Sequence, residues 1–223
     1  MMGKLDRTEQ RIVGVLIEKQ LSVPDSYPLS ENALVDGCNQ KSNREPTMDL
    51  LPFQVAGALM ALQEKGFVAK VEGGGRVARY RHRVEEQVGV GAEAMPVLAE
   101  LLLRGPQAPG ALKPRVARMG FTASPERIEA VLHQLAQHAP PLVELLPLGP
   151  RERDRRWRHL LGDGSEATAP AADAAAAATA TAPGPVPAGP REASLEARLA
   201  VLEQQVQSLQ DQVDQLRQRG THG

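Results

Sequence analysis

Apolar residues recur at helical spacing in three stretches of the first 85 residues. The spacing predicts helices over residues 5–19, over 30–38 with Ser30 as N-cap, and over about 52–65. Residues 67–71 and 76–83 flank a glycine-rich turn and predict a β-hairpin. Because three helices followed by a hairpin are the element order of a winged helix, we expect a winged-helix domain over residues 1–85.

Residues 86–162 repeat this order and predict a second winged-helix domain. We expect helices over residues 95–104, 112–119 and 125–135, then strands over 142–146 and 155–160. The strand motif at residues 79–82 (RYRH) recurs at 156–159 (RWRH). The predicted fold class is therefore mainly α with small β-hairpins (α+β), built as two tandem winged-helix domains.

The remaining residues predict a linker and a helix. Residues 163–192 are rich in Ala, Pro, Thr and Gly and carry too little apolar surface to fold, so we expect a flexible linker. Residues 193–219 then carry an apolar heptad repeat, which predicts a parallel two-stranded coiled coil and hence a homodimer. The alternative is one amphipathic helix packed on its own protein. The heptad residues are Leu195, Leu199, Leu202, Val206, Leu209, Val213 and Leu216.

Charge and composition exclude several classes of protein. The net charge is −1, made of +1 over residues 1–85 (12 basic, 11 acidic), +1 over 86–164 (10 basic, 9 acidic) and −3 over 165–223 (4 basic, 7 acidic). Any contact with DNA must therefore come from local clusters. The single cysteine, Cys38, excludes a disulfide framework. The polar N-terminus and the lack of a long apolar run predict a cytoplasmic protein without a membrane partner.

Catalytic signatures are absent from the sequence. No metalloprotease, serine-hydrolase, dithiol or phosphate-loop motif occurs, and the glycines at residues 73–75 are typical of a hairpin turn. His133 and His138 are five apart and do not share a helical face, so they predict no metal site. We expect a protein that is not an enzyme and that has no cofactor, metal or small-molecule ligand.

Two polar clusters favour double-stranded DNA as a partner. The first precedes the third helix, where the groove-reading connection of a helix-turn-helix lies. The second consists of hairpin arginines that could follow a phosphate backbone. The residues predicted to bind DNA are Asn39, Gln40, Lys41, Ser42, Asn43, Arg44, Arg76, Arg79, Arg81, Arg151, Arg153 and Arg156. The alternatives are a loop whose side chains bond their own backbone and strand arginines that only prevent aggregation.

The composition of the third helix does not favour base-specific contacts with DNA. Its expected exposed face, with Gln54, Ala58, Ala61 and Glu64, has Lys65 as its one basic residue. Base-edge contacts in the major groove depend on Arg, Lys, Asn and Gln side chains.

Four short segments resemble the YceH-like family of uncharacterised bacterial proteins. They are residues 27–34 (YPLSENAL), 37–46 (GCNQKSNREP), 102–107 (LLRGPQ) and 158–161 (RHLL). The resemblance covers about residues 4–161 and implies tandem winged-helix domains. It implies no particular activity.

Two functional hypotheses follow from these patterns. The first is a dimeric DNA-binding protein, such as a transcriptional regulator, whose coiled coil tethers two weak sites. The second is a protein-interaction scaffold that uses its winged helices as partner-binding modules, as ScpB-like proteins do. Near-neutral domains and apolar helix faces motivate the second hypothesis.

Overall fold

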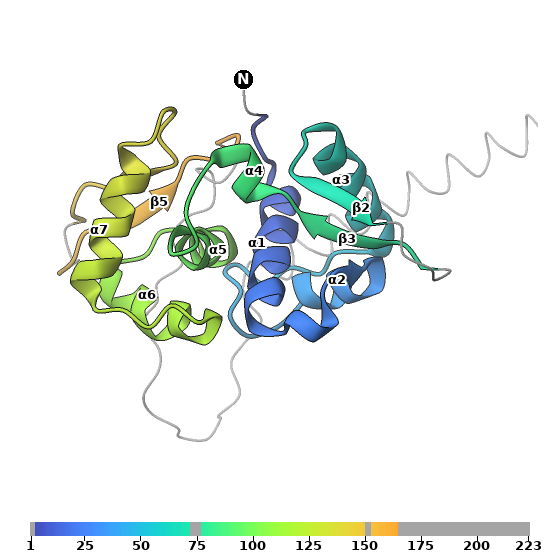
Figure 1. The fold of residues 1–223 in the computed structure, drawn as a ribbon, viewed down its shortest axis with the longest axis horizontal. Helices are drawn as coiled ribbons and strands as arrows, with labels where there is room; N and C mark the ends of the chain where they lie inside the picture. The colour runs from blue at the N-terminus through green and yellow to red at the C-terminus, as the bar shows by residue number, and fades with distance from the viewer. Residues whose placement is uncertain (1–2, 72–76, 150–152, 165–223) are drawn as a thin grey trace, which may run out of the picture. The chain divides into compact units, whose positions relative to one another are not determined.

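The computed structural model describes residues 3–71, 77–149 and 153–164. These residues form one compact unit of mixed α/β structure, with seven α-helices and two small antiparallel sheets in the described part (Figure 1). The mixed character agrees with the predicted α+β class.

The first half contains the three predicted helices. They are α1 (Arg7–Ser22), α2 (Glu31–Cys38) and α3 (Pro52–Glu64), with a 3₁₀ turn η1 at Pro24–Ser26. Helix α1 begins with a capping box, in which Asp6 accepts from the backbone N–H of Glu9 and Glu9 accepts from that of Asp6. Ser30 caps α2 as predicted, and Gly66 follows α3 at a φ of 77°, a left-handed conformation that glycine adopts without strain.

A three-stranded antiparallel sheet completes this half. Its strands are β1 (Leu29–Ser30), β2 (Val68–Val71) and β3 (Arg79–His82), in the order β1-β3-β2. Strands β2 and β3 are the predicted hairpin. Strand β1 was not predicted, because two residues are too few to display an alternating pattern.

The second half follows a short helix α4 (Val84–Val88), which the sequence analysis did not predict. Its elements are α5 (Ala94–Arg104), α6 (Pro109–Val116), η2 (Ala117–Met119), α7 (Pro125–Ala136), β4 (Val143–Leu145) and β5 (Trp157–His159). Ser124 caps α7, with Pro125 at its first position, as the sequence predicts. The predicted helices and strands of this half are all present.

The recurring strand motif occupies equivalent positions in the two halves. Tyr80 lies between Leu29 on β1 and Lys70 on β2, whereas Trp157 lies between Gln107 and Leu145 on β4. The histidine two residues after each aromatic residue pairs with a valine, Val68 in one half and Val143 in the other. The repeat in the sequence therefore corresponds to a repeated strand register.

The two halves share one hydrophobic core along their first helices. Helices α1 and α5 pack side by side at the centre of the molecule, where a Cβ on Gly14 would lie 2.9 Å from Cδ2 of Leu103 (Figure 1). The chain start is tied to the second half, because the N–H of Leu5 donates to the carbonyl of Leu161 and the N–H of Asp163 donates back to Leu5. The halves are thus joined as one body.

Several predictions concern residues that the structure does not describe. The linker after Gly164 and the heptad residues 195–216 are among them. In the part of the chain that is described, no helix is both long and apolar enough to span a membrane.

Candidate functional site

Helix α3 exposes large apolar side chains beside the polar ones that the sequence predicts to be exposed. Ala58, expected on the exposed side, is buried beside Val55 and Leu59, whereas Phe53 and Met60 face outward. The apolar stripe of Val55, Leu59 and Leu62 faces the core, and Ala58, four residues before Leu62, lies at the edge of this stripe. Gln54 and Glu64 are exposed as predicted, so the exposed side of α3 carries both polar and apolar side chains.

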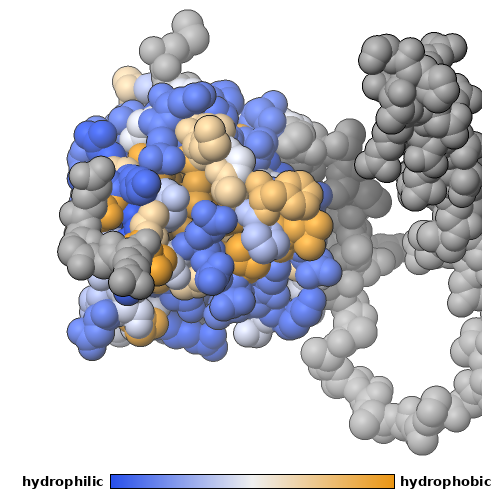
Figure 2. Space-filling model, turned by 90° about the vertical axis from the view of Figure 1, so that its right-hand side faces the viewer, coloured by the Kyte–Doolittle hydropathy of each residue, from blue (hydrophilic) through white to orange (hydrophobic). Residues whose placement is uncertain are grey.

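This face is strongly exposed for residues of its type. Phe53 is 70% exposed, Met60 is 64% exposed, and Leu51, just before the helix, is 53% exposed. Gly57 lies one turn from both Phe53 and Met60, and no heavy atom would lie within 4 Å of a Cβ at this position. We call Phe53, Gly57 and Met60 the α3 face; the exposed Glu64, four residues after Met60, lies at its C-terminal end. Figure 2 looks toward this side of the molecule, where apolar side chains stand among hydrophilic ones.

The loop before α3 holds Arg44 inside the protein. Its five N–H groups all have acceptors: Nε donates to the carbonyl of Gly37, Nη1 to Glu18 and the carbonyl of Asn43, and Nη2 to Glu18 and Gln40. Arg44 is only 3% exposed. The prediction that Arg44 contacts DNA is therefore wrong, because its guanidinium is saturated by groups of its own chain.

The neighbouring amides also bond within the protein. The side chain of Asn39 donates to the carbonyl of Leu50 and accepts from its N–H, at 2.9 and 2.7 Å. Nδ2 of Asn43, a residue at a φ of 57°, lies 3.1 Å from Oε1 of Glu100 on α5. The bonds of Asn39 match the alternative of a loop whose side chains bond their own backbone, whereas Asn43 bonds a carboxylate of α5. Of the six predicted loop residues, Lys41 and Ser42 are the exposed ones.

A second arginine lies buried beneath the same loop. Arg11 of α1 is 2% exposed and donates to the carbonyls of Cys38 and Pro46. Burial, together with the nearby charge of Arg44, lowers its pKa to about 10. Burial also raises the pKa of Glu100. The loop is thus locked to α1 and α5 by polar groups that serve the structure.

The hairpin arginines are divided between several surroundings. Arg79 is exposed and donates to the carbonyl of Pro28, whereas Arg81 pairs with Glu86 at 3.0 Å. Arg153 is exposed, and Arg156 is partly buried and has an interaction partner. Arg76 and Arg151 lie outside the described residues. Of the described arginines, Arg79 and Arg81 lie on β3 of the first half, whereas Arg153 and Arg156 lie just before β5 of the second half.

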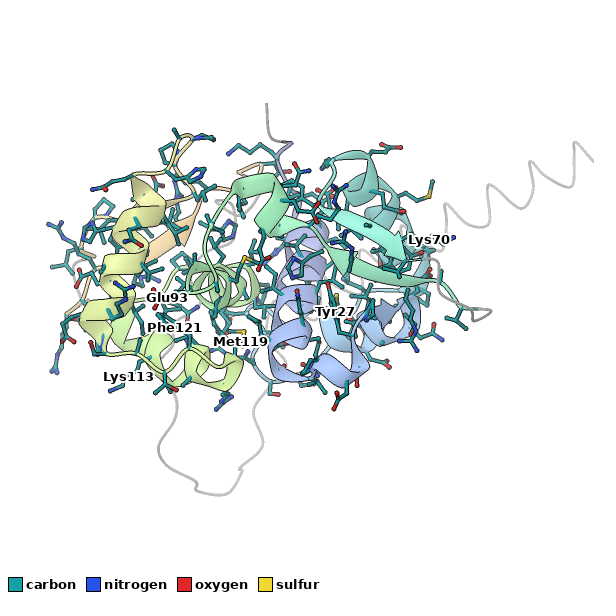
Figure 3. All side chains as sticks on the ribbon, in the orientation of Figure 1. Tyr27, Lys70, Glu93, Lys113, Met119 and Phe121 are labelled. Carbon is teal, nitrogen blue, oxygen red and sulfur yellow. The ribbon has the colours of Figure 1, made fainter. Side chains whose placement is uncertain are left out.

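Some of the other described cations are paired, whereas Arg104 and Arg118 lie near Arg115, where their charges add to burial in lowering its pKa. Arg83 pairs with Glu86, Arg127 with Glu93 and Arg158 with Glu144. Lys70 on β2 and Lys113 on α6 lie on opposite sides of the molecule (Figure 3). An extended phosphate-binding surface needs neighbouring cations that are free to contact phosphates.

The described residues carry little that suggests a catalytic or metal-binding site. Burial raises the pKa of the Cys38 thiol to about 12, so that it stays protonated and unreactive at neutral pH. Among residues 3–71, 77–149 and 153–164, no group of three His, Cys, Asp or Glu residues could hold a metal ion. The α3 face is the feature of the described surface that most needs an explanation.

The sequence contains a pattern that could have predicted the exposed position of Phe53 and Met60. Together with Gly57 they follow the spacing i, i+4, i+7, which marks one face of a helix, opposite the stripe of Val55, Leu59 and Leu62. A helix with two apolar faces indicates a second contact besides the core.

The fold and this face define a helix-rich mixed α/β protein with an exposed apolar helix. Residues 5–152 match the family model described as "Protein of unknown function, DUF480". The chain is 40% identical to a UPF0502 protein of Pelobacter propionicus, over 96% of this chain and 93% of that protein. It is 38% identical to a UPF0502 protein of Hahella chejuensis, over 98% and 99%.

The chain therefore belongs to the DUF480 family, whose curated members are named UPF0502 proteins. This membership agrees with the resemblance to the YceH-like proteins.

Proposed function

We propose that this protein is a non-enzymatic protein-interaction scaffold that docks partners on the α3 face. We further infer that each half is a winged helix. In the first half the order of three helices and a hairpin, with β3 central in the sheet, supports this inference. In the second half the pairing of Gln107 with Trp157 corresponds to the pairing of β1 with β3.

One observation carries the proposal. At the position where a winged helix would present a groove-reading helix, α3 presents Phe53 and Met60, 70% and 64% exposed, and no Arg or Lys between Pro52 and Glu64. Exposed aromatic and methionine side chains are typical of protein-binding surfaces. Covering the exposed part of each side chain would contribute roughly 1–2 kcal/mol of hydrophobic free energy, against which the entropy cost of association counts.

The partner chemistry that fits this face is an amphipathic helix with Leu or Val at its contact positions. When one helix docks on another, the side chains at positions i, i+3, i+4 and i+7 of the docked helix make the contacts. The gap at Gly57, between Phe53 and Met60, can accept one side chain of such a partner helix.

A peptide-display selection tests this proposal. The full chain serves as bait for a library of helical peptides, beside a Phe53→Ser, Met60→Ser variant and a control that carries Gln134→Ser on the exposed side of α7. We expect wild type and control to enrich peptides with Leu, Val or Phe at helical spacing, and the double variant to enrich none. Equal enrichment by the double variant would contradict the proposal.

DNA binding is the second candidate function, and exposed polar side chains on the loop before α3 and on the hairpin favour it. Lys41 and Ser42 lie at the surface of the loop before α3, and Arg79 is exposed on the hairpin. The measurement is fluorescence anisotropy with random-sequence duplex DNA over a salt series. If both cations contact phosphates, Lys41→Ala with Arg79→Ala lowers the slope of log K against log salt by about 2.

A third variant, Lys113→Ala, is the control for the effect of removing a positive charge elsewhere on the surface. Lys113 is exposed on α6, in the second half. Equal salt curves for wild type, the Lys41→Ala, Arg79→Ala variant and Lys113→Ala would remove DNA binding through this loop and hairpin.

A further inference from the structure

Three arginines of the second half form a cluster of positive charge. Arg104 is the last residue of α5, Arg115 lies in the last turn of α6, and Arg118 follows in η2. Residues 101–125 carry four basic side chains and no acidic one. We propose that this arginine cluster binds the phosphoryl group of a small ligand, either inorganic phosphate or a phosphate monoester.

The packing of α6 on α5 brings the three side chains together. Arg115 and Arg118 are three residues apart, the spacing of neighbours on the surface of a helix or a 3₁₀ turn. Burial and, after it, the charges of Arg104 and Arg118 lower the pKa of Arg115. The three cations are therefore neighbours in space, although they come from three different elements.

A buried glutamine holds the central arginine of the cluster. Nε2 of Gln107 donates to the carbonyl of Glu100 at 3.0 Å, and its Oε1 accepts from Nη1 of Arg115. The backbone of Gln107 exchanges hydrogen bonds with Trp157 on β5. Because Gln107 is thus fixed to both α5 and β5, it orients the guanidinium of Arg115 before any ligand binds. A donor that is oriented in advance loses less entropy on binding.

The guanidinium groups of the cluster retain donors for a ligand. Arg115 uses one of its five N–H groups on Gln107, and the other four make no hydrogen bond within the described residues. In the same part of the chain, no carboxylate lies within ion-pair distance of Arg104, Arg115 or Arg118. Arg118 is exposed, and the other two are half-buried. This is the opposite of Arg44, whose N–H groups all have acceptors inside the protein.

Glu100 is an acidic residue whose charge acts on Arg104 and Arg115. Its side chain is buried and its Oε1 lies 3.1 Å from Nδ2 of Asn43, so it is held toward the loop after α2. It offsets at most one of the three positive charges. At least two positive charges of the cluster therefore remain for a ligand.

A phosphoryl group matches this arrangement in charge and in hydrogen bonding. A phosphate monoester carries a charge of about −1.5 to −2 at pH 7 and three strong acceptor oxygens. Guanidinium groups bind such oxygens through pairs of N–H groups. A nucleic-acid strand spreads its charges along its length, whereas these cations gather around one residue, Arg115. Sequence motifs could not predict such a ligand, because the three arginines meet only in the fold.

Isothermal titration calorimetry with the full chain tests the proposal. Inorganic phosphate and glycerol 3-phosphate are the probes, and chloride keeps the ionic strength constant. The Arg104→Gln, Arg118→Gln variant removes two charges and leaves the bond between Arg115 and Gln107 in place. The control is Arg127→Gln with Arg158→Gln, which removes two charges from exposed arginines that pair with Glu93 and Glu144.

We expect saturable binding of phosphate to wild type and to the control. The cluster variant should bind at least about tenfold more weakly, because it loses charge-assisted hydrogen bonds. Binding of both probes would mean that the site accepts an ester, and binding of inorganic phosphate alone would identify free phosphate as the ligand. No saturable binding to wild type, or equal binding by the cluster variant, would overturn the proposal.

A single substitution keeps the test decisive if the double variant does not fold. Arg118→Gln changes an exposed side chain that makes no hydrogen bond within the described residues. This variant should also bind phosphate more weakly than wild type does. Unchanged affinity in a folded Arg118→Gln protein would remove Arg118 from the site and overturn the cluster as its basis.

Duplex DNA and the α3 face provide two further comparisons. If random-sequence duplex binds to wild type but not to the cluster variant, while phosphate binds to neither protein, the cluster is a nucleic-acid surface and the proposal falls. The Phe53→Ser, Met60→Ser variant should bind phosphate as wild type does. The phosphate site and the scaffold proposal can therefore fail separately.

Discussion

Nη2 of Arg44 lies 2.6 Å from Oε2 of Glu18, and this ion pair joins the loop after α2 to helix α1. The side chain of Arg44 is completely buried and that of Glu18 is 12% exposed. Removing one partner of a buried ion pair leaves the other desolvated and unpaired. The pair therefore makes the loop part of the core rather than a free binding segment.

We predict that Arg44→Met lowers the free energy of unfolding by about 3 kcal/mol, because Glu18 and several carbonyls lose their donor. Urea denaturation measures this change. Lys41→Ala, three residues away and exposed, is the control and should stay within about 0.5 kcal/mol of wild type. Equal denaturation midpoints for the two variants would show that Arg44 is not structural.

Gly14 sets the distance between α1 and α5. A Cβ at this position would lie 2.9 Å from both Cγ and Cδ2 of Leu103, so Gly14→Val should lower the free energy of unfolding by about 1–3 kcal/mol through overpacking. Thermal denaturation measures the loss. Gly57→Ala is the matched control, because no heavy atom lies within 4 Å of its new Cβ and helix propensity favours Ala by up to about 1 kcal/mol.

Two adjacent residues of α3 separate the core from the exposed face. Leu59 is 1% exposed and Met60 is 64% exposed. Leu59→Ala should cost about 2–5 kcal/mol of stability by leaving a cavity, whereas Met60→Ala should change it by less than about 0.5 kcal/mol. Urea denaturation of the two variants tests this difference. A large loss for Met60→Ala would mean that the α3 face is packed within the folded protein.

The two histidines of the repeated strand motif should make stability depend on pH. Burial, reinforced by a neighbouring arginine, lowers the pKa of His82 and of His159 to about 4, below the ordinary value of 6.5. Between pH 6.5 and about 4 the unfolded chain therefore binds protons that the folded protein does not. Stability is fully present above pH 6.5 and falls as the pH drops, by up to about 3 kcal/mol for each histidine.

The measurement is urea denaturation at steps from pH 7 to pH 5. Glu100 works in the opposite direction, since burial raises its pKa, so that a histidine variant is needed to isolate the effect. His82→Gln should reduce the loss of stability over this range by about half. An unchanged pH profile in that variant would mean that His82 takes up protons as readily in the folded protein as in the unfolded chain.

Much of the secondary structure could be predicted because its signals are local. Ser30 and Ser124 cap their helices, Gly66 ends α3, and the recurring RYRH and RWRH strands take equivalent registers in the two halves. A cap or a stop depends on a few neighbouring residues, all of which the sequence displays. The short β1 and α4 escaped prediction because each spans too few residues to show a period.

The sequence alone determined the order of the longer helices and of the two hairpins, the caps at Ser30 and Ser124, and the recurrence of this order in the second half. Only the tertiary structure decided that Phe53 and Met60 stay exposed beside the polar residues of α3, and where Arg44 points. Helix α3 has apolar residues on both sides, so only the packing of the other elements shows which of them are covered. Arg44 turns inward because Glu18 and the carbonyl of Gly37 meet it there, and Glu18 lies 26 residues away along the chain. Contacts between residues so distant in sequence exist only once the chain has folded.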